Sequence, residues 1–392
     1  MLYQDCIEEL TGWKDLIIKE VKNVFGELHI YGRMKKRIHD CPNCGEKTSK
    51  VHDYRQQTVK DVSAFGQRVH IHLQKRRHVC PVCGKRFYES IESLPKYYRM
   101  TIRLIAFILK EFEDIQSMST IAKRANVSGQ TVARIFDHVQ HPKPDLPEAI
   151  SIDEFRGNAG GERFQCLLTD PSKKEVLDVL PDRKAETLYG YFSTINNRKD
   201  IRYVVMDMSA HFRTIAKTCF PKATIVADRF HVVRQVCWAM ENVRKEEQKK
   251  FHGNRRKYFK RSRTLLLKHH DELSESQIQR VNIMLQTSQR LSRAYGVLQD
   301  FYKLMDCTGS KQARKHLGAW MMRVQSYDLP EFQPCITAIT NWTKEILASF
   351  DCGLSNGYTE GVNNKIKVIK RVSFGVQRFD RLRNRILFNM GR

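Results

Sequence analysis

Three acidic residues, Asp153, Asp207 and Glu360, lie where predicted strands end or a predicted helix begins. Asp153 and Asp207 each close a short apolar, β-branched run, which is the pattern of a buried strand. Glu360 follows the helix-breaking pair Asn356-Gly357 and falls in the first turn of a periodic segment that predicts a helix. We therefore expect two strand ends and one helix to present the three carboxylates.

Carboxylates arranged in this way can converge on two divalent cations. Mg²⁺ and Mn²⁺ prefer hard oxygen ligands and keep positions open for water and phosphate. Two such ions about 4 Å apart activate the attacking oxygen and stabilise the leaving oxygen when a phosphodiester bond is broken. A single acid at a strand end is usually a solvated cap, so the prediction rests on the order and context of all three. The expected cofactor is Mg²⁺ or Mn²⁺.

More than 150 residues separate Asp207 from Glu360, which is far more than a strand-to-helix connection needs. The first part of this stretch holds a third predicted strand, followed by an Asp-x-x-His pair at Asp228 and His231. Across residues 241–350 apolar side chains recur at helical spacing without a strand pattern. We therefore predict an all-helical insertion.

The insertion begins with a strongly basic segment. Residues 244–263 contain ten Lys and Arg side chains, with Phe251, Tyr258 and Phe259 between them. Such a face can bind backbone phosphates and offer stacking surfaces to unpaired bases. A charged, solvated helix is nearly as good an interpretation for any single residue of the segment.

Four of the eleven cysteines form two knuckles of the same form, Cys41-Pro-Asn-Cys44-Gly and Cys80-Pro-Val-Cys83-Gly. Two such turns supply the four thiolates of a tetrahedral zinc site. Alternating strand residues between the knuckles favour a zinc ribbon with Zn²⁺ held by these four cysteines. The alternative, four unrelated free cysteines, is disfavoured because duplicated knuckles seldom arise by chance. The other seven cysteines show no paired spacing and are expected to be small apolar residues.

Residues 118–136 predict a short helix, a turn and a second helix. Ser128 can cap the second helix, which would direct Gln130, Thr131 and Arg134 towards a major groove of DNA. An ordinary helical hairpin is a serious alternative, because the pattern is short and common. Three prolines within residues 141–147 predict a stiff linker after this region.

The composition favours a polyanionic partner. The 392 residues include 68 Lys and Arg against 43 Asp and Glu, a formal net charge of +25. The longest apolar run, residues 104–109, is far too short to span a bilayer, so no membrane partner is expected. The first ten residues include acids where an export signal has bases, so we expect a cytoplasmic, nucleoid-associated protein.

The helix of Glu360 has two distinct faces. Steps of three and four residues line up the polar side chains of Glu360, Asn364, Lys367 and Arg371. The neighbouring apolar stripe is expected to pack on a sheet and consists of Val362, Ile366 and Ile369. Lys367 and Arg371, together with Arg378, are then placed to bind the DNA backbone beside a cut. The alternative is a solvated basic helix, since the helix dipole favours bases near its carboxyl end.

Several motifs in this order resemble the insertion-sequence transposases of the ISL-three family, relatives of the Mutator-like group. The motifs are Ser151-Ile-Asp-Glu-Phe155, Val205-Met-Asp-Met208, Ala227-Asp-Arg-Phe-His-Val232, Ser355-Asn356, Glu360-Gly361, Asn363, Ile366-Lys367 and Arg381-Leu-Arg-Asn-Arg385. The resemblance covers nearly everything from Cys41 to Arg392. It implies a DDE transposase that binds the terminal inverted repeats of its own element in bacteria, as a homo-oligomer on double-stranded DNA. It also implies that His231 lies near the active site, against the alternative of a structural histidine at a helix start.

The expected fold is α/β, with an RNase-H-like catalytic domain, an all-α insertion, and a zinc ribbon and helix-turn-helix before them. The expected segments are a helical segment at 1–35, a zinc ribbon at 36–95, a helix-turn-helix at 99–140, a catalytic domain at 148–240 and 351–392, and a helical insertion at 241–350. Two other functions remain open: a DNA-binding regulator derived from an inactive transposase, and a nuclease without strand transfer. A regulator would have no reason to keep three acids in context.

Overall fold

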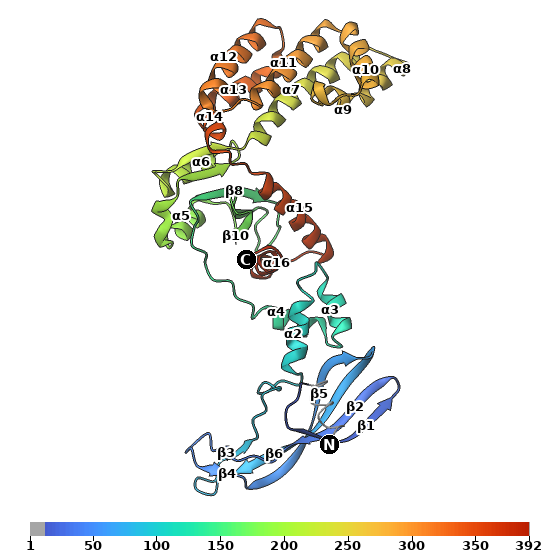
Figure 1. Ribbon diagram of the computed structural model, residues 1–392, viewed down its shortest axis with the longest axis vertical. Helices are drawn as coiled ribbons and strands as arrows, with labels where there is room; N and C mark the ends of the chain where they lie inside the picture. Colours follow the sequence, from blue (N-terminus) through green and yellow to red (C-terminus); the bar gives the residue numbers. More distant parts are fainter. Residues whose placement is uncertain (1–11, 392) are drawn as a thin grey trace. The chain divides into compact units, whose positions relative to one another are not determined.

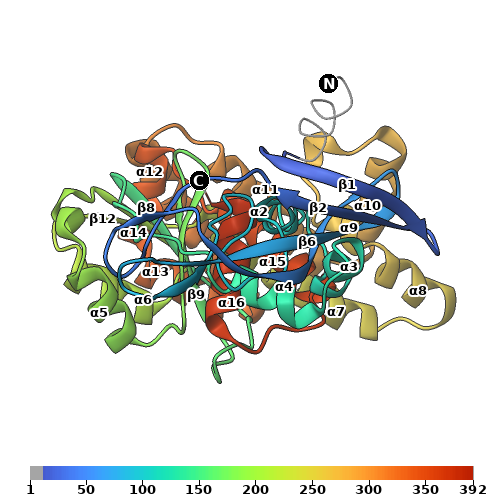
Figure 2. The same cartoon turned by 90° about the horizontal axis from the view of Figure 1, so that it is seen from below.

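The computed structural model describes residues 12–391, which Figures 1 and 2 show as ribbons. It divides into two compact units. The first consists of residues 1–140 and 369–375, and the second of residues 141–368 and 376–392. The chain is of mixed α/β class, as expected.

The first unit is built on a five-stranded sheet. Its strands are β1 (Leu16–Val24), β2 (Glu27–Met34), β5 (Val51–Ala64), β6 (Gln67–Val79) and β7 (Arg86–Tyr88). The order is β1-β2-β6-β5, with β7 paired to β6, and only the β2–β6 pair is parallel. Alternate residues of β6, including Val69, Ile71 and Leu73, point into a core that also holds Trp13 and Ile30.

The helical prediction for residues 1–35 is wrong over residues 16–34, while residues 1–11 lie outside the described part of the chain. The two strands there form a hairpin whose turn residues, Phe25 and Gly26, both have positive φ. Two such residues match the right-handed twist of paired strands. The apolar spacing around Trp13 concealed this turn, because the phenylalanine is an unusual residue for a left-handed conformation.

The first unit also contains a two-stranded sheet, β3 (His39–Asp40) with β4 (Lys47–Thr48), and three short helices, α2 (Ile102–Lys110), α3 (Met118–Arg124) and α4 (Gly129–Phe136). Ile121 of α3 and Val132 of α4 are fully buried between them. The hydroxyl of Ser128 accepts a hydrogen bond from the backbone N–H of Thr131, so the predicted cap is confirmed. Helix, turn and helix therefore occur where the sequence predicted them.

The second unit contains the sheet expected to hold the acids. Its strands are β8 (Ala149–Phe155), β9 (Gln165–Asp170), β10 (Glu175–Leu180), β11 (Tyr203–Met206) and β12 (Thr224–Ala227). The order is β10-β9-β8-β11-β12, antiparallel among the first three and parallel from β8 to β12. The strands predicted from the three apolar runs are confirmed.

Helices cover both faces of this sheet. Leu188 of α5 (Ala185–Ser193) and Ile215 of α6 (Ala210–Cys219) pack with one face. On the other face, α15 (Gly357–Val372) and α16 (Phe379–Met390) pack with Leu167 and Val179. Val362 and Ile366 belong to this second core, which confirms the predicted packing on the sheet for these two residues of the α15 stripe, whereas Ile369 is buried outside this core.

The insertion is helical, as predicted, but it begins earlier than residue 241. Its helices are α7 (Arg229–Lys249), α8 (Gly253–Arg261), α9 (Arg263–Leu266), α10 (Glu275–Thr287), α11 (Gln289–Met305), α12 (Ser310–Ser326), α13 (Gln333–Asn341) and α14 (Thr343–Cys352). Short 3-10 turns occur within the insertion at η2 (His270–Glu272) and η3 (Pro330–Phe332), and another, η1 (Asn196–Asp200), precedes β11. One continuous helix, α7, runs from the end of β12 into the bundle, and its Val232 and Val236 already belong to the bundle core (Figure 1).

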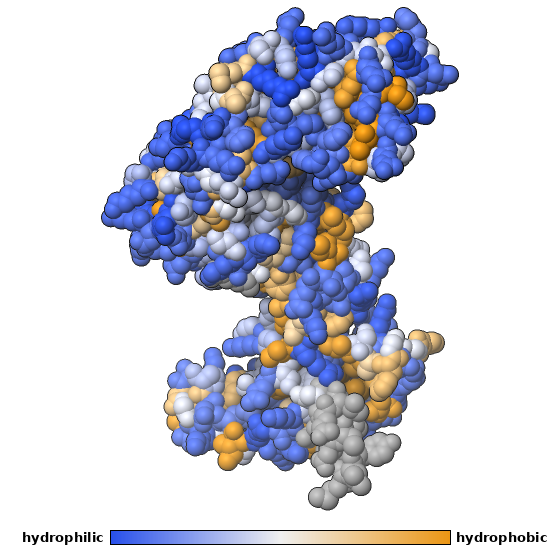
Figure 3. All heavy atoms as spheres, turned by 45° about the horizontal axis from the view of Figure 1, so that its top comes forward, coloured by the Kyte–Doolittle hydropathy of each residue, from blue (hydrophilic) through white to orange (hydrophobic). Residues whose placement is uncertain are grey.

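Hydrophilic residues cover most of the face shown in Figure 3. Among residues 12–391 no helix is both long and apolar enough to cross a membrane.

Candidate active site and metal centres

The four knuckle cysteines converge in the first unit. The Sγ atom of Cys83 lies 3.5 Å from those of Cys41 and Cys44, and Sγ of Cys44 lies 3.6 Å from that of Cys80. Four thiolates bound to one zinc ion at about 2.3 Å lie roughly 3.8 Å apart, so this spacing fits a tetrahedral centre.

The backbone explains the repeated Cys-Pro-x-Cys-Gly form. Gly45 and Gly84 donate backbone hydrogen bonds to the carbonyls of Cys41 and Cys80, which closes each turn. Both glycines have φ near +70°, a conformation that other residues adopt at a cost. Each knuckle is therefore a prefolded turn that presents two sulfur atoms. Within each knuckle, a local backbone hydrogen bond therefore sets the positions of the two cysteine side chains.

The second centre is produced by strand register. In the parallel part of the sheet Ile152 of β8 is paired with Met206 of β11, and Met206 is paired with Ala227 of β12. The residue that follows each of these is an acid, namely Asp153, Asp207 and Asp228. Because the strands run in the same direction, the three acids lie side by side at one edge of the sheet.

His231 binds two of these acids. Its Nδ1 lies 2.8 Å from Oδ1 of Asp207 and 2.9 Å from Oδ2 of Asp228. Burial by itself would lower the pKa of His231. Hydrogen bonding to the two acids, together with their negative charges, outweighs this effect and raises the pKa to about 10. The imidazole is therefore protonated at neutral pH in the absence of a metal ion, its Nδ1–H donates to Asp228, and its charge lies within ion-pair distance of Asp207.

Asp153 is the most buried of the three predicted catalytic acids. Burial, followed by the negative charge of Asp207, raises the pKa of the Asp153 carboxyl to about 7. Its Oδ2 accepts a hydrogen bond of 2.7 Å from Nδ2 of Asn363, and its Oδ1 accepts one from the backbone of Glu154. A buried acid beside other acids is stabilised when a cation binds between them, so the donor set fits a divalent ion.

Buried polar contacts hold the first turn of α15 on this edge. The backbone N–H of Asn356 donates to Oδ1 of Asp228, and the Asn356 side chain is hydrogen-bonded to Ser151 of β8. One turn later the hydroxyl of Thr359 lies 2.8 Å from that of Thr169 on β9. These contacts tie the helix to two strands that lie about 200 residues earlier in the chain.

Glu360 lies in the first turn of α15, as predicted, but its side chain is exposed. Its helical neighbour at i+3 is Asn363, whose side chain contacts Asp153, so the two lie on the same face. Among the described residues, two groups of acids and histidines have ligand atoms within 4.8 Å of one another, namely His39, His78 and Glu89 in the first unit and Asp207, Asp228 and His231 at this edge. Asp153 lies beside the second group through the strand register, and Glu360 is not part of it.

The sequence patterns assigned no role to Asn356, Thr359 or Asn363, although both asparagines occur in the motifs that carry the family resemblance. The sequence pattern singled out Asp228 only as part of the Asp-x-x-His pair. Its place in the group could have been inferred from the third strand, since this strand ends on an acid like the other two. Asp170, at the end of β9, instead accepts backbone hydrogen bonds from Ser172 and Lys173 in a turn.

The residues predicted to contact DNA differ in their solvent exposure and in the hydrogen bonds they already make. Gln130 and Arg134 of α4 are exposed, whereas the hydroxyl of Thr131 lies 2.9 Å from that of its cap Ser128. On α15, Lys367 and Arg371 are exposed, and Lys367 donates a hydrogen bond to Asn364. Arg378 is exposed just before α16.

The stacking surface predicted within residues 244–263 is wrong for Phe259, which is only 1% exposed and belongs to the core of the helical bundle. Phe251 and Tyr258 are half-buried and pack against that core. The alternation of aromatic and basic residues therefore reflects, in large part, helices that are buried on one side.

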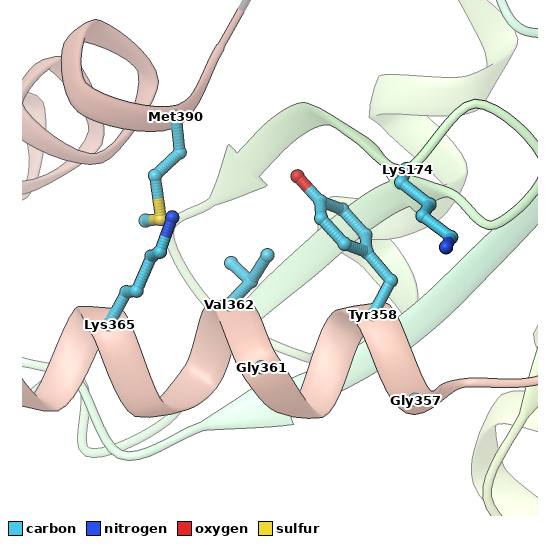
Figure 4. Close-up of a pocket in the computed structure, with 7 residues that line it drawn as sticks. All are labelled: Lys174, Gly357, Tyr358, Gly361, Val362, Lys365 and Met390. Atoms are coloured by element: carbon cyan, nitrogen blue, oxygen red, sulfur yellow. The ribbon is translucent and has the colours of Figure 1, made fainter.

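A cavity of about 570 Å³ lies over the other side of α15. Figure 4 shows Tyr358, Val362 and Lys365 projecting from the helix on the side of Met390, while Lys174 lies on a neighbouring turn. The acids at the sheet edge do not line it. The cavity is therefore separate from the metal-binding edge.

Comparison with known proteins agrees with this geometry. The model of the ISL3 (ISL-three) DDE family, described as a transposase, matches residues 150–386, which include all the acids described above. The chain belongs to this transposase family. A second family, the zinc-finger of transposase IS204/IS1001/IS1096/IS1165, matches residues 37–83 and contains the four cysteines of the cluster. The enzyme is thus a polynucleotidyl transferase with a zinc-ribbon segment.

Individual relatives of the transposase agree. This chain is 28% identical to the transposase for insertion sequence element IS1001 of Bordetella parapertussis, in an alignment of 391 residues that covers 96% of this chain and 95% of the relative. It is 24% identical to the transposase for insertion sequence element IS1557 of Mycobacterium tuberculosis, in an alignment of 254 residues that covers 58% of this chain and 56% of the relative. The family resemblance expected from the sequence motifs is confirmed.

Proposed function

We propose that the second unit is an RNase-H-like catalytic domain in which Asp153, Asp207 and Glu360 hold two divalent ions, Mg²⁺ or Mn²⁺. The single observation that supports this most is the strand register that places Asp153 and Asp207 side by side, with α15 seated against them. The mixed sheet order, with antiparallel strands on one side of β8 and parallel strands on the other, is consistent with this fold. When bound, the ions would activate the attacking oxygen and stabilise the leaving one.

The protein side chains have separate roles in this proposal. Asn363 donates to Asp153 and so fixes the orientation of its carboxylate. In the absence of metal ions the single positive charge of His231 offsets part of the negative charge of Asp207 and Asp228, which reduces their repulsion before DNA arrives. The contact between Asn356 and Asp228 places the first turn of α15, and therefore Glu360, at the same edge. Water would attack the phosphodiester first, and the released 3′-hydroxyl would attack the target DNA afterwards.

We propose that the first unit binds the terminal inverted repeats of the element. The four cysteines would hold Zn²⁺, and α3 and α4 would form a helix-turn-helix with Gln130, Thr131 and Arg134 towards the major groove. The net charge of +25 supports a polyanionic partner. Lys367, Arg371 and Arg378 would bind backbone phosphates of double-stranded DNA near the cut, in a homo-oligomeric complex at the bacterial nucleoid.

The test is incubation of purified protein with a labelled element end, a target DNA and Mg²⁺. A transposase produces new 3′ ends and joined products. A nuclease without strand transfer produces only the ends, and a regulator that merely binds DNA produces neither. Failure to form joined products under conditions that give specific binding would remove the proposed strand transfer.

A further inference from the structure

Helix α7 has an exposed stripe of aromatic and basic residues. Phe230 and Trp238 are 48% and 47% exposed, and Arg234 lies between them on the helix. The three residues are spaced by four positions and therefore share one face. The guanidinium of Arg234 lies 4.6 Å from the ring centroid of Trp238, within the range of a cation–π contact.

The orientation of this stripe is fixed by the packing of the helix. The opposite face of α7 is buried in the bundle through Val232, Val236 and Val243. Trp238 also differs from the other tryptophans, since Trp13, Trp320 and Trp342 are at most 5% exposed. Large apolar side chains on a soluble surface commonly mark a binding site when they are grouped.

The stripe starts at the metal-binding edge. Phe230 lies between Asp228 and His231 in the chain, and its ring meets the His231 ring edge-on at a centroid distance of 5.6 Å. Eight residues further along the helix, Trp238 is about 12 Å away along the axis. That length corresponds to roughly three to four base-pair steps of duplex DNA, at about 3.4 Å per step, before any pairing is lost.

We propose that Phe230, Arg234 and Trp238 bind unpaired nucleotides next to the cut, with Trp238 stacking on a base and Arg234 binding a phosphate. The inference rests on the proposed function, because it assumes that DNA is cut at the acids. Base faces are covered in a continuous duplex, so a tryptophan can stack only where pairing is lost or a strand ends. Aromatic residues next to Arg are the chemistry of single-strand binding.

Charge favours DNA over a protein partner on this face. The exposed side of α7 continues with Asn242, Lys245, Glu246 and Lys249, and Lys249 is paired with Glu246, so the aromatic residues lie within a polar surface on which bases outnumber acids. The guanidinium of Arg234 also lies between the rings of Phe230 and Trp238 along the helix, so the two rings do not form one apolar patch. Loss of base stacking costs about 1–3 kcal/mol per base, which is about five- to 150-fold in an equilibrium or a rate.

The direct test uses 2-aminopurine, whose fluorescence falls when it stacks on an aromatic ring. The probe is placed at each position within four nucleotides of the element boundary, and the protein is the Asp153→Asn variant, which should bind without cutting. Adding Trp238→Ala to this variant should raise the fluorescence at one or more positions. Met322→Ala is the matched control, because Met322 is 67% exposed on α12 of the same bundle and should leave the fluorescence unchanged.

A second arm measures cleavage. Trp238→Ala should slow cutting of a fully paired end by about five- to 150-fold, and an end with mismatches beside the cut should recover most of the loss. Trp238→Phe should retain most of the activity, and Arg234→Ala should show a smaller defect. Thermal unfolding of each variant should match the parent protein, since the changed side chains are exposed.

Equal fluorescence with and without Trp238 at every position would overturn the inference. So would a change in the mass of the complex by sedimentation without a change in fluorescence, because a protein would then occupy the stripe. If wild-type protein binds the end but never cuts it, the proposed catalytic function fails, while the fluorescence comparison still decides whether the stripe stacks on bases.

Discussion

The cysteine cluster and the acid cluster are both suited to cations, but they are assembled over very different distances in the sequence. Each cysteine knuckle is a turn of five residues closed by its own backbone hydrogen bond. The acids are brought together by the pairing of three strands, and α15 reaches them after a long insertion. A local turn can be recognised from a motif, whereas an edge built by strand register depends on the whole unit.

The two centres also differ in whether a bound cation would keep a position open for a reactant. Four thiolates close a coordination sphere and leave no position for a reactant. Carboxylates at a sheet edge, with Glu360 exposed beside them, leave room for water and a phosphate. We therefore expect substitutions at the first centre to affect DNA binding and substitutions at the second to affect cleavage.

The largest expected effect is at the acids. Asp153→Asn, Asp207→Asn or Glu360→Gln should each reduce cleavage on the order of 10³-fold or more, because a neutral amide is a poor ligand for a divalent ion. End binding, measured by gel shift, should remain close to wild type. Near-normal cleavage by Glu360→Gln would mean that its exposed carboxylate is not a ligand.

The cysteines should give the opposite pattern. Cys44→Ser or Cys83→Ser should lower the zinc content and specific end binding together, since three thiolates hold zinc less well than four. The core around Trp13 and Ile71 lies in the same unit, so the sheet should persist while the knuckles loosen. Zinc analysis and gel shifts test this, and full zinc occupancy with normal binding would exclude the ribbon centre.

His231→Ala should reduce cleavage by about 10²-fold, since it leaves Asp207 and Asp228 without their shared cation. The melting temperature of the metal-free protein should fall, and Mg²⁺ should raise it more than in the wild type. A fall in melting temperature without a separable cleavage defect would instead support a purely structural histidine.

Adjacent asparagines on α15 offer a matched pair. Asn363→Ala removes the hydrogen bond to Asp153 and should reduce activity or metal affinity by about 10- to 100-fold. Asn364→Ala removes only an exposed contact with Lys367 and should be close to wild type. Mg²⁺ titrations of cleavage separate the two, and equal behaviour would show that Asn363 does not position Asp153.

The smallest effect concerns the basic face of α15. Lys367→Ala with Arg371→Ala should weaken cleavage modestly and reduce the slope of log affinity against log salt by about one per residue removed. Binding curves at several salt concentrations measure the slope. An unchanged slope in a folded double variant would identify this face as a solvated one.

Local sequence patterns predicted many strands and helices of the second unit, but not the long-range polar contacts that join α15 to the sheet. The apolar runs located β8, β11 and β12, and the helical period located α15 and its buried stripe. The hairpin at Phe25-Gly26 was missed because its turn lacks the usual residues. The roles of Asn356 and Asn363 were missed because their partners lie more than 100 residues away in the chain.

Exposure was also beyond the reach of sequence patterns. Phe259 and Trp238 both lie in helices that contain several basic residues, yet one is in the bundle core and the other faces outward. The difference depends on which side of each helix meets the rest of the bundle. A charge pattern alone does not contain that information.

The late position of α15 and α16 affects how the protein is made. The strands that include Leu167 and Val179 leave the ribosome about 180 residues before the helices that cover them. At roughly 5–20 residues per second, this apolar surface waits on the order of ten seconds or more for its cover. A chain that ends before Gly357 would keep that surface open and would lack Asn363, so only completed translation produces a closed catalytic unit.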